Sequence, residues 1–162
     1  MHREGWIGAL LDEYERSINE FLIWSDRIES SRFEEVIDPE TEDPDCRSFR
    51  SICEHVVNAG HGYNHYLEKY YLEKKSVRVK VTITKENLKD ELRTMFSQTE
   101  KVCNELRSAD EEWLMVPFQS DWGQEYDTEQ LLEHAVLHVL RHRRQLEKFI
   151  EQISLKGKIM DR

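Results

Sequence analysis

Residues 133–145 read EHAVLHVLRHRRQ, and this apolar, helix-forming run carries three histidines four residues apart, His134, His138 and His142. Side chains at i and i+4 lie one turn apart on the same face of an α-helix, so two adjacent imidazoles can bind one metal ion. The inward stripe of this helix steps by threes and fours, as a buried seam does. Its members are Leu131, Ala135, His138, His142, Gln145 and Phe149. His138 and His142 therefore stand where leucines are expected.

Length and charge limit the classes of protein. The chain has 162 residues, enough to bury about two thirds of its unfolded surface, and we expect a single domain over residues 1–162. It has 33 acidic and 23 basic residues and a formal net charge of -10, which argues against nucleic acid or an anionic membrane as partner. No apolar leader follows the first residues, and no run approaches the roughly 18 apolar residues of a membrane span. These features predict a cytoplasmic protein.

The cysteines carry no metal or disulfide pattern. Cys46, Cys53 and Cys103 are odd in number and include no Cys-x-x-Cys pair. Neither a disulfide framework nor a thiolate zinc site is indicated. We expect buried, inert thiols.

Four long amphipathic helices are predicted, at about residues 5–29, 47–72, 85–107 and 127–154, with Thr84 and Asp127 as N-caps of the last two. Two prolines in residues 37–45 end helix formation after the first. The alternating valines of residues 73–83 could form a short strand, although an extended crossover between distant helix ends is favoured. Residues 113–126, with two tryptophans, are expected to form an ordered loop or a small hairpin.

Each helix has one apolar stripe, which it can bury only against the other helices. The sequence therefore predicts an all-α fold, an antiparallel-rich four-helix bundle in which long connectors require at least one crossover.

A third metal ligand should come from a facing helix, because open metal sites commonly use three protein ligands. The second predicted helix offers His55, His61 and His65. His61 lies about 240° round the helix from His55, and His65 lies roughly 15 Å further along its axis, so only one of the three can join a compact site. Helical phase favours His55, which lies on the inward side. On spacing alone, the choice stays open.

Other polar residues of these two helices have two interpretations each. A straight helix cannot direct side chains from three consecutive turns at one ion. His134 therefore either supports the site from outside or lies on the surface. Asn58, one turn after His55, either touches a ligand or is solvated. The cluster of Arg141, Arg143 and Arg144 is a solvated face or holds an anionic substrate.

These residues together resemble a known family. The pattern His-x3-His-x3-His followed by Arg-x-Gln, at residues 134–145, and the run EHVVNA at residues 54–59 are similar to the DinB/YfiT superfamily of metal-dependent four-helix bundles. The resemblance spans nearly the whole chain. It implies that His55, His138 and His142 are the metal ligands. Members often have glycine where this chain has Arg144, which leaves the ligand spacing unchanged.

The resemblance also implies a function. Characterised relatives include thiol S-transferases and mycothiol-dependent isomerases, so we expect a divalent-metal enzyme, with zinc or nickel, that activates a low-molecular-weight thiol for transfer to an electrophilic substrate. One alternative is a hydrolase that uses metal-bound water, although the last helix lacks the glutamate of a His-Glu-x-x-His motif. Another is a non-catalytic metal-binding stress-response protein whose bundle forms a homodimer.

Overall fold

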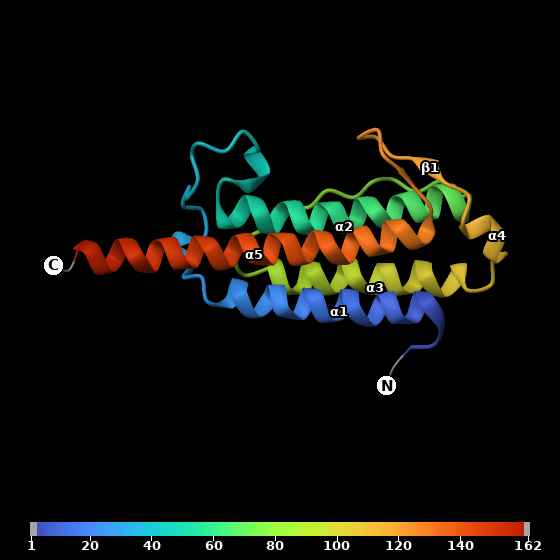
Figure 1. Ribbon diagram of the computed structural model, residues 1–162, viewed down its shortest axis with the longest axis horizontal. Coiled ribbons are helices and arrows are strands. Elements are labelled where there is room, and N and C mark those ends of the chain that lie inside the picture. Colours follow the sequence, from blue (N-terminus) through green and yellow to red (C-terminus); the bar gives the residue numbers. More distant parts are fainter. Residues whose placement is uncertain (1–2, 161–162) are drawn as a thin grey trace.

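The computed structural model describes the backbone of residues 3–160 and the side chains through Ser154. Four long helices lie along one another in a bundle, which confirms the all-α prediction (Figure 1). They are α1 (Gly5–Asp26), α2 (Phe49–Tyr71), α3 (Leu88–Leu106) and α5 (Thr128–Met160). The short elements are η1 (Ser30–Arg32), η2 (Pro44–Cys46), α4 (Glu111–Leu114), β1 (Phe118–Gln119) and β2 (Glu125–Tyr126).

Helix α1 ends at Asp26, three residues before its predicted end, and two further boundaries differ from the sequence prediction for local reasons. Residues 85–87 form a turn rather than the start of α3. Thr84 and Asn87 cap each other there: Thr84 N donates to Asn87 Oδ1 at 2.8 Å and Asn87 N donates to Thr84 Oγ1 at 3.3 Å. At the other end of the chain, α5 continues to Met160, because no proline follows its start. Residues 118–126 form the expected small hairpin, with β1 paired antiparallel to β2.

The helices form a closed ring of contacts, in which α1 packs on α5, α5 on α2, α2 on α3, and α3 on α1. Figure 1 shows that α1 runs parallel to α5 and α2 parallel to α3, so only two of the four contacts are antiparallel. The parallel pair α2 and α3 requires the chain to return along the whole bundle between them. The predicted crossover is therefore present, and it makes the bundle less antiparallel than expected.

The core lies between the four apolar stripes. Phe21 and Ile52 are fully buried within it, as are Leu92 and Leu131. At Gly60, a Cβ would lie 2.5 Å from Met95 Sδ, so the glycine allows α2 and α3 to approach closely. All three cysteines are free and buried, as predicted.

The crossover, residues 72–87, runs back along α2 in extended form without making a strand. Asn58 on α2 holds it with both atoms of its amide: Oδ1 accepts from Val81 N at 2.8 Å, and Nδ2 donates to Val81 O at 3.0 Å. Two residues later, Ile83 N donates to Glu54 Oε2 at 3.0 Å, and the Ile83 side chain is fully buried. The amide of Asn58 therefore fixes the crossover and is not free to orient a ligand.

Replacing Asn58 with alanine should release this part of the crossover. The change removes two hydrogen bonds, each contributing about 0.5–1.5 kcal/mol net, so we expect the free energy of unfolding to fall by about 1–3 kcal/mol. Amide exchange at Val81 should accelerate in the same variant. Asn104→Ala, at an exposed position of α3, is the matched control. Unchanged protection of the Val81 amide would show that other contacts hold the crossover.

None of the helices in the described part of the chain combines the length and the apolarity that crossing a bilayer requires.

Candidate metal centre

Three of the seven histidines meet between α2 and α5. One nitrogen from each of His55, His138 and His142 lies within 4.8 Å of the other two. The Nε2 atoms of His55 and His138 are 2.9 Å apart, and the ring centroids of His138 and His142 are 4.5 Å apart. The structure therefore brings together the three residues that the sequence and the family resemblance selected.

The positions of the three rings follow from the helices that carry them. His138 and His142 lie one turn apart on the face of α5 that packs on α2. His55 lies one turn before Ala59 on α2 and reaches α5 from the opposite side. His142 is 4% exposed, whereas His55 and His138 are only partly buried. The cluster is thus closed on the His142 side and open toward the surface near the other two.

Two further residues orient the imidazoles of His55 and His142. The Nδ1 of His55 lies 3.0 Å from Oδ2 of Asp45, which the short helix η2 presents. The Nδ1 of His142 lies 2.5 Å from Oε1 of Gln145, one turn on along α5. Metal-binding histidines usually donate their second ring N–H to such an oxygen, which leaves the Nε2 lone pair for the ion.

Burial keeps the two imidazoles of α5 neutral. Together with the neighbouring His142 and His55, it lowers the pKa of His138 from 6.5 to about 2. Burial likewise lowers the pKa of His142 to about 4, again with a contribution from His55. Neutral imidazole is the form that binds a metal ion, so His138 and His142 are in the binding form at neutral pH without losing a proton.

The donor set fits a divalent ion. Two imidazole nitrogens bound to one tetrahedral zinc at 2.0–2.1 Å would lie about 3.3 Å apart. The observed separations run from 2.9 Å to at most 4.8 Å, so small ring rotations suffice. Three imidazole nitrogens suit a divalent transition-metal ion and leave further coordination positions for a small molecule.

His134 belongs to an aromatic wall beside the cluster. Its ring centroid is 5.9 Å from that of His138, but it is not one of the grouped ligands. Its Nδ1 lies 3.4 Å from the hydroxyl of Tyr126, and its ring stacks on Trp122 at 6.3 Å. Tyr63 presents its edge to both His134 and His138. Of the two interpretations from sequence, support of the site from outside is the one that the contacts favour.

The other polar candidates lie outside the cluster. His61 is buried with Nδ1 3.3 Å from Oε1 of Gln98 on α3, and His65 contacts Ser76 of the crossover at 2.7 Å. Arg143 joins α5 to α1 through an ion pair with Glu20 at 3.4 Å. Arg141 and Arg144 are exposed, as a solvated face requires.

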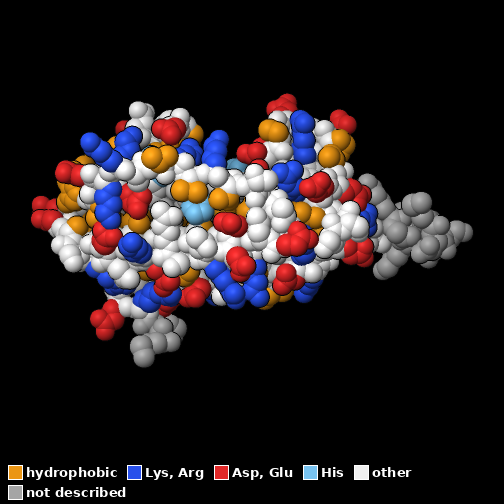
Figure 2. All heavy atoms as spheres, turned by 180° about the vertical axis from the view of Figure 1, so that it is seen from behind, with side chains coloured by type: hydrophobic (Ala, Val, Ile, Leu, Met, Phe, Trp, Pro, Cys, Tyr) orange, Lys and Arg blue, Asp and Glu red, His pale blue; other side chains and the backbone are white. Residues whose placement is uncertain are grey.

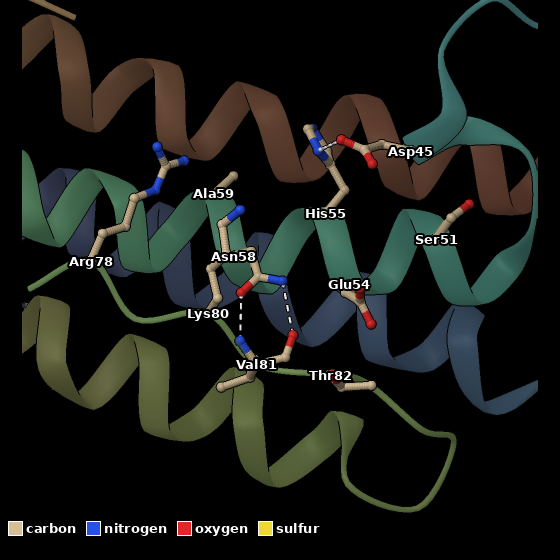
Figure 3. Close-up of a pocket in the computed structure, with 10 residues that line it drawn as sticks. All are labelled: Asp45, Ser51, Glu54, His55, Asn58, Ala59, Arg78, Lys80, Val81 and Thr82. Atoms are coloured by element: carbon tan, nitrogen blue, oxygen red, sulfur yellow. Dashed lines mark hydrogen bonds and ion pairs between the residues drawn. The ribbon is translucent and has the colours of Figure 1, made fainter. Parts of the chain in front are cut away.

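Two hollows adjoin the histidine cluster. One, of about 440 Å³, lies along α2 and the crossover and is lined by Asp45, Glu54, His55, Asn58, Arg78 and Lys80 among others (Figure 3). The second, of about 290 Å³, has the aromatic wall on one side. Both are lined by His55, Ala59 and Arg78. Figure 2 shows the surface hollowed between two projections, which Figure 1 identifies as the loop before α2 and the β1–β2 hairpin.

The fold and the histidine cluster define a four-helix bundle with a candidate metal centre between two helices. The DinB family model matches residues 42–161, from the loop before α2 almost to the end of the chain, and the chain belongs to the DinB family. This family is typically metal-dependent. No curated protein sequence matches the chain.

Solved structures show the same fold. The crystal structure of the mycothiol-dependent maleylpyruvate isomerase is similar with a TM-score of 0.59 and 11% identity, over 86% of this chain and 60% of that chain. A histidine-to-alanine variant of that enzyme is similar with a TM-score of 0.59 and 10% identity, over the same shares. The chain thus spans about 60% of the length of the isomerase. At this level of identity, the likeness concerns the fold alone.

Proposed function

We propose that His55, His138 and His142 bind one divalent metal ion, zinc or nickel, and that the chain is a metal-dependent enzyme. Its reaction is the transfer of a low-molecular-weight thiol to an electrophilic small molecule. The observation that carries this proposal is the cluster of three imidazoles, open on one side to two hollows of about 440 and 290 Å³.

When bound, a metal ion lowers the pKa of a thiol that coordinates it. Asp45 holds the imidazole of His55 in one tautomer, and Gln145 does the same for His142. Tyr63 and Trp122 shield one side of the centre from water. The thiol proton leaves to solvent, the sulfur forms a bond to carbon, and the leaving group departs with its electron pair. No side-chain base is needed for these steps.

Two observations favour thiol transfer over hydrolysis. Among the described residues, no carboxylate belongs to the group of possible ligands, and the nearby carboxylate of Asp45 is engaged with His55. Hydrolases of the His-Glu-x-x-His type place a free carboxylate beside the metal-bound water as the base. The similar solved structure is that of a mycothiol-dependent enzyme, which supports a thiol as the small molecule here.

Cobalt substitution tests the proposed function directly. We expect a sulfur-to-metal charge-transfer band when 2-mercaptoethanol is added to the cobalt-loaded protein, and faster conjugation of that thiol to a chlorodinitrobenzene. Both signals should be absent from His138→Ala and present in His65→Ala, which alters a histidine of α2 outside the cluster.

Other outcomes would contradict the proposed function. Ester turnover without thiol, together with no charge-transfer band, would indicate a hydrolase. A cobalt ion that binds neither thiol nor azide would indicate a non-catalytic metal-binding protein.

A further inference from the structure

The crossover contributes two cations to the hollow beside the histidine cluster. Arg78 and Lys80 line the 440 Å³ hollow together with His55, and Arg78 also lines the aromatic one. In Figure 3, the side chain of Arg78 extends from the crossover across α2 toward α5. Arg78 therefore lies where the two hollows meet, and His55 lines the same two hollows.

Gly62 makes room for this arginine. A Cβ at that position would lie 3.1 Å from Nη2 of Arg78 and 3.3 Å from its Nε. The guanidinium thus rests on the backbone of α2, and a larger side chain at that position would displace it. This contact keeps the cation near the hollow although it begins on an exposed segment.

The charges around the hollow leave these cations available. Among the described residues, the ion-pair partner of Arg78 is Asp121 at 3.8 Å, whose side chain is 71% exposed. Lys80 forms no ion pair with any residue in the described part of the chain.

The two carboxylates of the same hollow are both engaged. Glu54 accepts a hydrogen bond from Ile83 N at 3.0 Å and lies 3.4 Å from Arg50, and Asp45 lies 3.0 Å from His55. Neither carboxylate of the hollow is therefore an ion-pair partner of Arg78 or Lys80, although the chain as a whole has a net charge of -10.

We propose that Arg78, assisted by Lys80, binds a carboxylate of the thiol substrate and so selects an anionic thiol over a neutral one. This inference rests on the proposed function and names the class of its thiol. A planar guanidinium binds a carboxylate through two parallel hydrogen bonds, and an ammonium adds a point charge. The carboxylate occupies the crossover side of the hollow, while the sulfur faces the histidine cluster.

The first experiment compares two thiols of similar size on the cobalt-loaded protein. The affinities of 3-mercaptopropionate and 2-mercaptoethanol are measured by titration of the charge-transfer band. We expect Arg78→Gln to lower the ratio of the two affinities, which measures the preference for the carboxylate thiol, about five- to tenfold. Arg78→Lys should restore part of this preference. Arg93→Gln, at an exposed position of α3, should leave it unchanged. An unchanged preference in Arg78→Gln would overturn the inference.

A second experiment uses neither a thiol nor a metal ion. Glutarate is titrated into the metal-free protein at low ionic strength, and binding is followed by NMR of the arginine Nε–H groups. We expect Arg78→Gln to weaken glutarate binding about fivefold, with Arg93→Gln unaffected.

The two experiments separate the proposals. Glutarate binding that depends on Arg78, without any thiol band, would support the carboxylate site and contradict the proposed function. A thiol band with no dependence on Arg78 in either experiment would support the proposed function and contradict the carboxylate site.

Discussion

Replacing His138 with alanine is expected to lower the affinity for zinc more than a hundredfold. His138 lies close to both other candidate ligands, with its Nε2 2.9 Å from that of His55 and its ring centroid 4.5 Å from that of His142. Loss of a residue that hydrogen-bonds a metal ligand costs 10- to 100-fold in metal affinity, and loss of a ligand itself should cost more. Competition titration with a zinc chelator measures the effect.

The matched control for this variant is His134→Ala. His134 lies one turn earlier on α5, and its ring is only 5.9 Å from that of His138, but it is not part of the ligand group. We expect its replacement to change zinc affinity by a few-fold at most. Equal losses in both variants would place the ion elsewhere, and retention of zinc by His138→Ala would contradict the site.

The metal-free protein should lose stability steeply below about pH 6.5. The pKa of His138 is lowered to about 2 and that of His142 to about 4 in the folded protein, whereas unfolded histidine has a pKa near 6.5. Protons therefore bind the unfolded chain first, so the stability is complete above pH 6.5 and falls as the pH drops toward 4. Between pH 7 and 5.5 we expect the two histidines together to lower the free energy of unfolding by about 2.5 kcal/mol.

Urea denaturation of the metal-free protein across this pH range measures the loss. In His142→Gln the free energy of unfolding should depend on pH about half as steeply, whatever the change in its value at pH 7. The carboxylate of Asp43 is not expected to contribute above pH 5: burial raises its pKa, but hydrogen bonds from Cys46 and the backbone outweigh burial and hold the pKa below its usual range. A flat stability between pH 7 and 5.5 would show that the cluster is hydrated and protonates freely.

The pair of histidines on α5 could be predicted from the sequence because it depends only on helical periodicity. The i, i+4 spacing of His138 and His142 puts both on one face, and the surrounding leucines and alanine identify that face as the buried one. The choice of His55 over His61 and His65 depended on how α2 is rotated about its axis relative to α5. Helical spacing favours His55 but does not fix this rotation. The family resemblance selected His55 among the three histidines of α2.

The residues that sequence reasoning missed all come from irregular segments or from contacts across the chain. Asp45 reaches His55 only because η2 folds back over the start of α2, and no periodic pattern encodes that path. Arg78 lines the hollow because the crossover runs along α2 in a fixed register, which the amide of Asn58 sets. A search for side chains that can bind an extended backbone would have suggested Asn58 and Glu54 as such contacts.

The order of the helices along the chain determines when the histidine cluster can exist. His55 and His138 are separated by 83 residues, and both ligands on α5 follow the crossover, α3 and the hairpin. During synthesis on the ribosome, two of the three imidazoles therefore emerge after all the other long helices. A nascent chain that stops before α5 has only one of the three, so tight zinc retention would report that the last helix has been made and docked.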